Sequence, residues 1–261
     1  MKNIDDKRLV ELVEELARTY KGSDWEAVKN KMMLRRYVKL CTEVNKWVGK
    51  KAQVLDLGCG EGQNMVILDK LGMDVVGIEI NRQPGWKKLK FDLKTYDGKR
   101  LPYKAGSFDA VVMFGVLEHI GPNPKGESKE DFEVNQEARL YSLKESRRVL
   151  KKKGKVFVYY FPNKYAPVEK LMEWIDFRPI HRGSEKQSLK SVKRLVESAG
   201  FEVIKCGRQN VIPMAVGTKS PWLRDRVLNR YYRELGKVDD LFERLLGDLV
   251  GQSNYVIGEK N

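Results

Sequence analysis

The stretch that decides the fold is residues 54–64, which reads VLDLGCGEGQN. Apolar residues flank Asp56 as in a buried strand, and glycine then occupies every second position, at Gly58, Gly60 and Gly62. Glycine has no Cβ, so such a segment can turn sharply and approach a ligand closely. Two interpretations follow: a tight turn without chemistry, or a cradle for a nucleotide-like cofactor. The spacing GxGxG departs from the GxGxxG of dinucleotide-binding proteins and fits a pyrophosphate poorly.

Strand and helix patterns alternate after this stretch. Apolar runs predict strands over residues 52–58, 74–80, 87–93, 107–115, 155–161, 201–206 and 253–260. Helical spacing of apolar residues predicts helices over residues 63–72, 133–154 and 188–200. This alternation favours an α/β fold built on a doubly wound, mostly parallel sheet. Two earlier helices, over residues 5–19 and about 25–48, are expected to form an N-terminal cover.

Length and composition exclude several classes of protein. The 261 residues are 41% hydrophobic, which is enough for a sizeable buried core. The longest apolar run, residues 110–117, is far shorter than the ~20 residues of a membrane span, and the N-terminal segment lacks a secretory apolar core. We therefore expect a cytoplasmic protein without a membrane span. Abundant Lys and Glu suggest a heat-adapted source.

Cysteine and histidine are sparse. The three cysteines, Cys41, Cys59 and Cys206, form no CxxC pair, and the chain has only two histidines. We predict neither a disulfide framework nor a metal site, and we expect three reduced thiols.

The net charge of +14 is concentrated in one part of the chain. Residues 178–237 contain 14 basic and 5 acidic residues, a net charge of +9. Such a concentration suggests a polyanionic partner, and RNA is the partner that we expect there.

Candidate ligand-binding residues follow the predicted strands. In an open parallel sheet, ligands bind beyond the carboxyl ends of the strands. The second predicted strand ends near Glu79, whose carboxylate is suited to the two hydroxyls of a ribose. The third ends in Asp92 and Leu93, which could bind an adenine edge, with Asp97 as a competing candidate. The fourth ends at Phe114, beside the expected cofactor.

Several motifs taken together carry a resemblance to a known family. The segments VLDLGCGEG, VVGIEI, LPYKAGSFDAVVMFGVLEHI, SRRVLKKKGKVFV and ESAGFEVI resemble class I S-adenosylmethionine-dependent methyltransferases, in the subtype with a type 11 methyltransferase domain. The resemblance implies a seven-stranded sheet whose last strand is antiparallel and lies between the fifth and sixth. It implies a core of residues 50–206 completed by a last strand at 253–261. It does not cover the helical segment 1–49 or the segment 207–252, which we interpret as a basic and aromatic helical cap.

The resemblance also implies the cofactor S-adenosylmethionine, with S-adenosylhomocysteine as product. The glycine segment would hold the methionine part, Glu79 the ribose, Ile80 the adenine face, and Asp92 with Leu93 the adenine edge. The residues expected to bind the cofactor are Asp56, Gly58, Cys59, Gly60, Gly62, Glu79, Ile80, Asp92, Leu93 and Phe114.

Glu118, His119 and Asn163 are the candidate catalytic residues. Methyl transfer is an in-line displacement, and a base helps when the acceptor keeps its proton until attack. Glu118 and His119 follow the fourth strand, and they are either a base and acceptor-orienting pair or helix-start contacts. Asn163 follows the fifth strand and either binds a planar acceptor or packs under the cap. His181 is expected to anchor a loop.

The sequence leaves the chemical class of the methyl acceptor open. A base of RNA (rRNA or tRNA) is narrowly favoured because of the basic 178–237 block, with its neighbouring Trp222, Tyr231 and Tyr232. A small metabolite or a lipid head group is the alternative. A catalytically inactive subunit that only binds the cofactor is a third possibility. The sequence does not indicate an oligomeric state.

Overall fold

A seven-stranded sheet forms the centre of the computed structural model, which describes residues 6–20, 29–167, 181–211, 222 and 224–261. The strands are β1 (Gln53–Leu57), β2 (Asp74–Glu79), β3 (Asp92–Thr95), β4 (Phe108–Phe114), β5 (Leu150–Pro162), β6 (Glu202–Gln209) and β7 (Ser253–Glu259). Their order is β3-β2-β1-β4-β5-β7-β6, and β7 pairs antiparallel with both β5 and β6. The predicted fold class and the position of the last strand are therefore confirmed.

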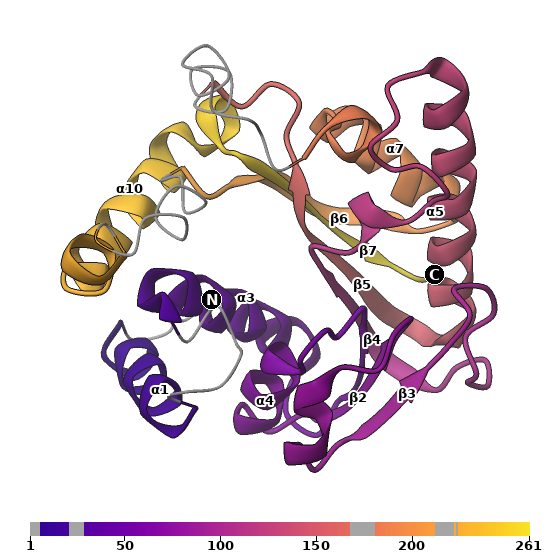
Figure 1. Ribbon diagram of the computed structural model, residues 1–261. Coiled ribbons are helices and arrows are strands. Elements are labelled where there is room, and N and C mark those ends of the chain that lie inside the picture. The colour runs from indigo at the N-terminus through magenta and orange to yellow at the C-terminus, as the bar shows by residue number, and fades with distance from the viewer. Residues whose placement is uncertain (1–5, 21–28, 168–180, 212–221, 223) are drawn as a thin grey trace.

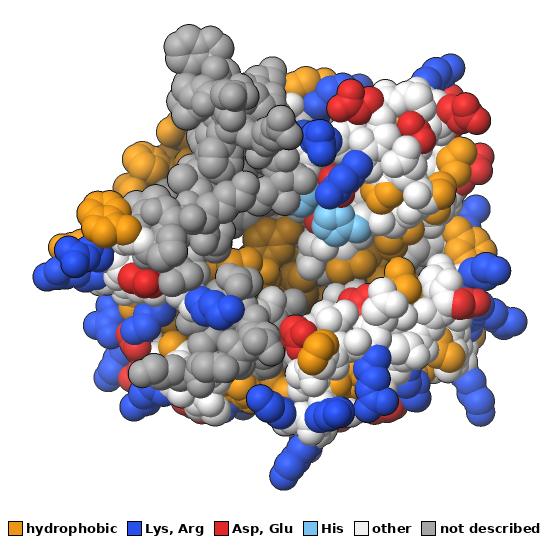
Figure 2. Space-filling model, viewed as in Figure 1, with side chains coloured by type: hydrophobic (Ala, Val, Ile, Leu, Met, Phe, Trp, Pro, Cys, Tyr) orange, Lys and Arg blue, Asp and Glu red, His pale blue; other side chains and the backbone are white. Residues whose placement is uncertain are grey.

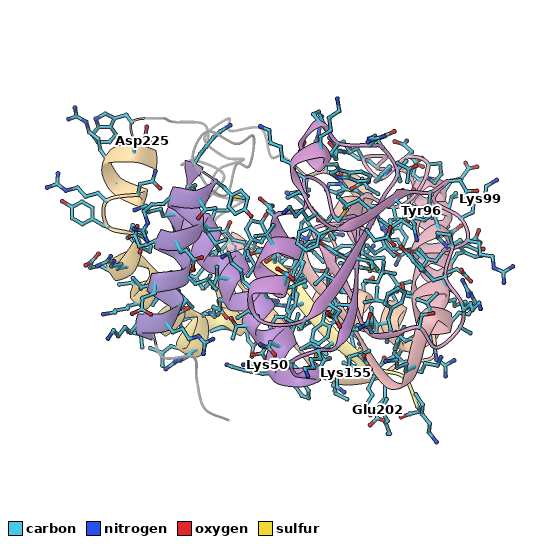
Figure 3. The ribbon with its side chains drawn as sticks, turned by 90° about the horizontal axis from the view of Figure 1, so that it is seen from below. Lys50, Tyr96, Lys99, Lys155, Glu202 and Asp225 are labelled. Carbon is cyan, nitrogen blue, oxygen red and sulfur yellow. The ribbon has the colours of Figure 1, made fainter. Side chains whose placement is uncertain are left out.

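The strands at the centre of the sheet are apolar because helices cover both of their faces. In β4 the residues Ala110 to Met113 are fully buried, and in β1 the residues Val54 and Leu55 are also buried. A continuous apolar run of this kind is typical of a parallel strand between two helical layers. The sheet turns its carboxyl ends toward one side, and Lys50, Lys155 and Glu202 lie on the opposite edge (Figure 3).

Helices pack on the two faces of the sheet (Figure 1). One face carries α1 (Asp6–Thr19), α3 (Lys31–Val48), α4 (Gln63–Lys70) and α10 (Tyr232–Val250). The other carries α5 (Lys129–Val149) and α7 (Leu189–Ser198). Serine side chains cap both helices of the second face: Ser128 accepts from the Asp131 amide, and Ser188 from the Ser191 amide. These bonds satisfy amide groups that a helix start otherwise leaves without partners.

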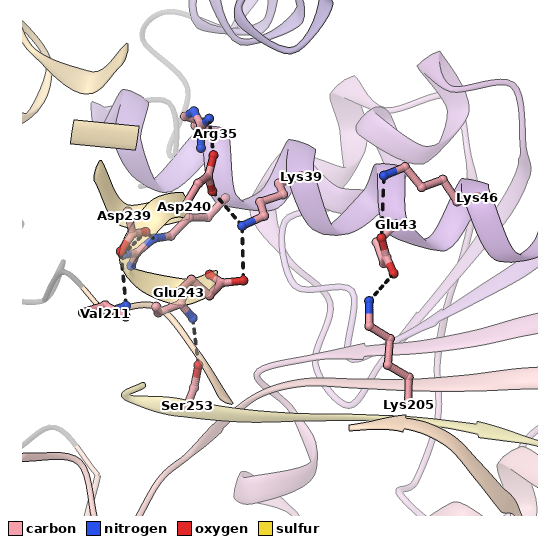
Figure 4. A network of polar contacts seen from close by, with 12 residues as sticks. Arg35, Lys39, Glu43, Lys46, Lys205, Val211, Asp239, Asp240, Glu243 and Ser253 are labelled. Atoms are coloured by element: carbon pink, nitrogen blue, oxygen red, sulfur yellow. Dashed lines mark hydrogen bonds and ion pairs between the residues drawn. The ribbon is translucent and has the colours of Figure 1, made fainter. Parts of the chain in front are cut away.

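The N-terminal cover and the helix before the last strand form one layer. Arg36 Nη2 lies 2.7 Å from Asp239 Oδ2, and the two side chains are 9% and 4% exposed. Arg35 and Lys39 both contact Asp240, at 2.7 Å in each case (Figure 4). Breaking a buried ion pair by removing one partner costs about 3–5 kcal/mol, so these contacts hold α3 and α10 together. The domain boundaries at 49, 206 and 252 remain predictions.

Several element boundaries differ from the predicted ones. The predicted strand over residues 87–93 is wrong, because a 3₁₀ turn, η1 (Pro84–Lys88), occupies its start and β3 only begins at Asp92. The predicted helix over residues 133–154 runs instead from Lys129 to Val149. Its last predicted turn belongs to β5, in which Lys153 adopts a φ of +64°. The sixth strand continues past residue 206 to Gln209.

Among the described residues no helix is both long and apolar enough to span a membrane.

Candidate methyl-transfer site

The glycine segment leaves β1 and bends around an open space. Gly58, Gly60 and Gly62 have φ values of +77°, +49° and +81°, which L side chains rarely adopt. The Gly58 amide donates to the Ile78 carbonyl at 2.8 Å, so the turn is fastened to β2. A Cβ on Gly58 would lie 2.4 Å from a Val116 methyl group, whereas a Cβ on Gly60 would meet nothing within 4 Å. The first glycine is required by packing, and the second faces space that a ligand can use.

Glu79 connects the end of β2 to this segment. Its Oε2 accepts from the Gly60 amide at 3.1 Å, and its Oε1 accepts from the Ile80 amide at 2.7 Å. Each carboxylate oxygen can accept a second hydrogen bond. The half-buried carboxylate is thus held in place, and its two oxygens can still accept hydrogen bonds from two hydroxyl groups. The Ile80 side chain beside it is 58% exposed.

Asp56 lies on β1 beneath the glycine segment. It is fully buried, and neither carboxylate oxygen has a hydrogen-bond partner among the described residues. Burial, and secondarily the charge of Glu79, raises the pKa of Asp56 to about 8. An unpartnered buried carboxyl is costly and marks a place where a donor or a cation is expected to bind.

These features fit S-adenosylmethionine. The cofactor would supply a cationic amine near Asp56 and the glycine segment, two ribose hydroxyls for Glu79, and an adenine face for Ile80. A Cβ would fill the space at Gly60, which agrees with a backbone that approaches its ligand closely.

The third strand places its acidic residues differently from the prediction. Asp92 is the first residue of β3 and pairs with Val76, whereas Thr95 pairs with Glu79. The Asp92 side chain lies back from the carboxyl edge and forms an exposed ion pair with Lys94 at 2.9 Å. Leu93 packs into the core instead of lining the carboxyl edge. The expectation that the third strand ends at Asp92 and Leu93 is wrong, because β3 continues to Thr95. Asp97 follows two residues later and stays the competing candidate for the adenine contact.

Aromatic residues from three elements line the region beyond β4. Phe114 stacks on Tyr159 with ring centroids 5.5 Å apart and an angle of 7°. Tyr160 adopts a φ of +65° at an irregularity of β5, and its ring meets that of Tyr37 edge-on at 5.5 Å. A strained residue of this kind persists when its surroundings require it, and such residues cluster at functional sites. Tyr37 belongs to α3, so the N-terminal cover contributes to the site, which the sequence did not reveal.

Glu118 and His119 lie in η2 (Leu117–His119), just after β4, beside a carboxylate from a distant segment. His119 Nδ1 is 2.9 Å from Oε1 of Glu185, which belongs to η3 (Gly183–Glu185). His119 Nε2 is 3.8 Å from Glu118 Oε1. The His119 side chain is 50% exposed, while Glu118 and Glu185 are buried. Burial raises the pKa of Glu118 to about 8. Glu118 and His119, predicted as a pair after the fourth strand, thus lie close together, and Glu185 joins them.

Arg139 on α5 holds η2 and η3 together. Its side chain is fully buried and donates to the carbonyls of Leu117 at 3.0 Å, Glu118 at 2.7 Å and Ser184 at 3.0 Å. Burial lowers the pKa of Arg139 to about 10. Arg139 was not among the predicted site residues, although an arginine on the inner face of a surface helix indicates a buried polar contact.

His181 and Asn163 contact different parts of the structure. The His181 ring stacks on His119 with centroids 5.5 Å apart, so His181 belongs to the site, and burial lowers its pKa to about 4. Asn163 is 1% exposed, donates to the Gly251 carbonyl at 2.9 Å and accepts from the Tyr165 amide at 3.1 Å. Its amide group is used to join β5 to the segment before β7. We therefore do not propose Asn163 as a catalytic residue.

The basic block at 178–237 is divided between the two faces of the sheet in the described part of the chain. Lys190, Lys193 and Arg194 lie on α7 on one face, and the last part of the block is carried by η4 (Arg224–Leu228) and α10 on the other. Several of its cations form ion pairs within the chain, such as Lys205 with Glu43 at 2.7 Å. In the described part of the chain, the sheet therefore lies between the cations of α7 and those of α10.

A groove of about 680 Å³ adjoins η3. Two aromatic rings line it, Phe132 at 38% exposure and Tyr165 at 53%. Its cationic lining residues are Lys129, Lys164 and Lys186.

In Figure 2 the histidine side chains lie at the rim of a hollow with a hydrophobic floor.

Comparisons with known proteins agree with the geometry. A family model described as a methyltransferase domain matches residues 30–205. A Xenopus tropicalis protein named tRNA (carboxymethyluridine(34)-5-O)-methyltransferase alkbh8 is 27% identical over 110 residues, which are 42% of this chain and only 15% of that relative. Ubiquinone biosynthesis O-methyltransferase of Pelagibacter ubique is 28% identical over 117 residues, 42% of each chain. The crystal structure of a SAM-dependent methyltransferase from Archaeoglobus fulgidus superposes with a TM-score of 0.57 at 18% identity, over 95% of this chain and 99% of that one.

Proposed function

Because the chain belongs to the class I S-adenosylmethionine-dependent methyltransferases, we propose that it transfers the methyl group to a hydroxyl oxygen, and that RNA carries this hydroxyl. The observation that carries the choice of oxygen is the cluster of Glu118, His119 and Glu185 after β4. A hydroxyl keeps its proton until it attacks, so its methylation gains from groups that promote loss of the proton. We assign that role to Glu118 and His119.

The groove beside η3 supports an RNA acceptor. Proteins that bind single-stranded nucleic acid combine aromatic rings, on which bases stack, with cations that follow the backbone. Phe132 and Tyr165 supply such rings and three lysines supply the charge. The relative named as a tRNA methyltransferase agrees with this class of acceptor.

A small hydroxylated metabolite is the second candidate acceptor. The division of the basic block between two faces favours it, because no continuous track for a long polyanion results in the described part of the chain. The relative named as a ubiquinone O-methyltransferase is consistent with it.

The test supplies methyl-labelled S-adenosylmethionine and a cell extract divided into RNA, protein and small molecules. We expect label in RNA, and nucleoside digestion followed by mass spectrometry should locate it on oxygen. Label in the small-molecule fraction alone would move the proposal to a metabolite, and label on nitrogen or carbon would refute the oxygen assignment. Cofactor binding without label in any fraction would support an inactive subunit.

The groove makes a separate prediction about RNA affinity. Tyr165→Ala should weaken RNA binding by about 5- to 150-fold, since one stacked base contributes about 1–3 kcal/mol. Tyr141→Ala is the matched control, because Tyr141 is also exposed, at 46%, but lies outside the groove. Filter binding at two salt concentrations measures both variants. Equal affinity of the two variants would show that the groove does not bind the acceptor.

A further inference from the structure

We propose that Glu118, His119 and His181 bind a divalent transition-metal cation. The cation would hold the acceptor hydroxyl beside the methyl group, and this second part rests on the proposed function. The donor set is two imidazole nitrogens and one carboxylate oxygen, and it lies at the rim of the hollow in Figure 2.

The geometry brings the three donors close to one point. One ligand atom from each residue lies within 4.8 Å of the other two, and His119 Nε2 is 3.8 Å from Glu118 Oε1. Bonds from zinc to nitrogen and oxygen are about 2.0–2.2 Å long, so two ligand atoms on one tetrahedral ion lie somewhat closer together than these distances. The three ligand atoms must therefore move closer together when they bind one ion.

Glu118 independently indicates a missing partner. Its side chain is 2% exposed, and its Oε2 has no hydrogen-bond partner among the described residues. The nearby Arg139 guanidinium donates to main-chain carbonyls, including that of Glu118 itself, and not to the Glu118 carboxylate. A buried carboxylate oxygen without a donor is rare unless an ion or water occupies the position.

Glu185 prepares His119 for metal binding. Histidine ligands commonly donate their second ring N–H to a carboxylate, which fixes the tautomer and the ring orientation. Glu185 Oε1 lies 2.9 Å from His119 Nδ1 and leaves Nε2 facing Glu118. The Arg182 amide donates to the other Glu185 oxygen at 3.0 Å, so the carboxylate is itself held. Glu185 is therefore a positioning residue for this site.

Two imidazoles and one carboxylate suit zinc or ferrous iron, and three protein ligands leave positions open for a reacting group. A hydroxyl bound at an open position loses its proton more easily. The oxygen then attacks the methyl carbon, a C–O bond forms, and the C–S bond breaks. The electron pair returns to sulfur, which becomes a neutral thioether, and the hydroxyl proton passes to water. In this arrangement Glu118 and His119 promote loss of the proton through the cation that they bind, and His119 does not itself accept the proton.

From the sequence alone we predict no metal site, because the chain has only two histidines. The two segments that carry them meet in the structure because Arg139 donates hydrogen bonds to both η2 and η3.

The test uses the full-length protein after dialysis against a chelator and removal of the chelator. Calorimetric titration with Zn²⁺, and the visible spectrum of added Co²⁺, should show one site. Glu118→Gln and His181→Ala should each weaken Zn²⁺ binding by more than about 100-fold, and Glu185→Gln by about 10- to 100-fold. Retained S-adenosylmethionine affinity would confirm that each variant is folded.

Two control variants separate this site from other donors. Cys206→Ser removes the thiol that is not fully buried, and Glu137→Gln removes an exposed carboxylate from α5. Both should bind Zn²⁺ as the wild type does. Absence of stoichiometric binding to the wild type, or binding that survives His181→Ala and is lost in Cys206→Ser, would overturn the proposal.

The metal titration needs no acceptor, so its outcome is independent of the proposed function. Metal binding without methylation of any hydroxyl would refute the oxygen assignment alone. Hydroxyl methylation at an unchanged rate in a metal-free enzyme would refute the cation's role in methyl transfer and leave His119 as the direct base.

Discussion

The cofactor side and the acceptor side of the site are built in opposite ways. On the cofactor side, Gly60 and Glu79 are 19 residues apart and lie after adjacent strands. On the acceptor side, His119 and Glu185 are 66 residues apart and meet because a buried arginine of α5 bonds to both segments. The first side follows from local spacing, whereas the second follows from tertiary contacts. Substitutions on the two sides should therefore affect S-adenosylmethionine affinity very differently.

The largest loss of cofactor affinity is expected from Gly60→Ala. The added Cβ would enter the space where the backbone meets the ligand, so affinity should fall by more than about 100-fold. Gly106→Ala is the control, because Gly106 also has a positive φ, +71°, and also has nothing within 4 Å of a built Cβ. Both variants should lose about 1–2 kcal/mol of stability from the strained backbone. Calorimetry and thermal unfolding measure the two effects, and equal cofactor affinity of the variants would refute the cradle.

Glu79→Ala should have the next largest effect. Loss of hydrogen bonds to a charged group costs about 1–3 kcal/mol, which corresponds to about 5- to 150-fold in affinity. Asp74→Ala is the control, since Asp74 lies on the same strand at its amino end. Calorimetry should find the control unchanged. If Glu79→Ala also binds as the wild type does, the ribose assignment is wrong.

A smaller, pH-dependent effect is expected from Asp56→Asn. The pKa of Asp56 is about 8 without cofactor, so the carboxyl holds a proton at neutral pH. A cationic ligand favours the ionised form, and binding therefore releases that proton. Wild-type affinity should rise with pH below 8, by up to about tenfold per unit. Titrations between about pH 6 and 7 keep most of the cofactor amine protonated. In Asp56→Asn the slope should vanish, and an unchanged slope would assign the titration to another group.

The smallest effect on cofactor affinity is expected from His181→Ala. His181 stacks on His119 on the acceptor side, so cofactor affinity should stay within about twofold, while methyl transfer falls. Calorimetry on the same protein that is assayed for turnover measures both quantities. A large loss of cofactor affinity would mean that the two sides are one structural unit.

The sequence predicted the fold and the cofactor side well because both depend on patterns within short segments. Continuous apolar runs identified β1 and β4, and the glycine spacing identified the segment between β1 and α4. Asp92 was misplaced because the 3₁₀ turn before β3 delays the strand, and pattern alone does not fix the register. A shift of this kind leaves Asp97, and not Asp92, as the carboxylate that follows the carboxyl end of β3.

The acceptor side was predicted only in part. Glu118 and His119 follow a strand and could be found, but Glu185 could not, since nothing in its local sequence links it to His119. Asn163 resembled a site residue, yet the strand geometry directs its amide to the Gly251 carbonyl. The left-handed conformation of Tyr160 was also beyond prediction, because tertiary packing imposes it on a residue with no preference for it.

The ion pairs between α3 and α10 affect the order in which the protein becomes functional during synthesis. Arg36 emerges from the ribosome long before Asp239, its partner 203 residues later. Until that late segment is made, the layer that carries Tyr37 lacks this fastening. Translation must therefore reach Asp239 before Tyr37 and the aromatic residues beyond β4 take their final positions, and a nascent chain that already contains every glycine of the segment after β1 is not yet a finished catalyst.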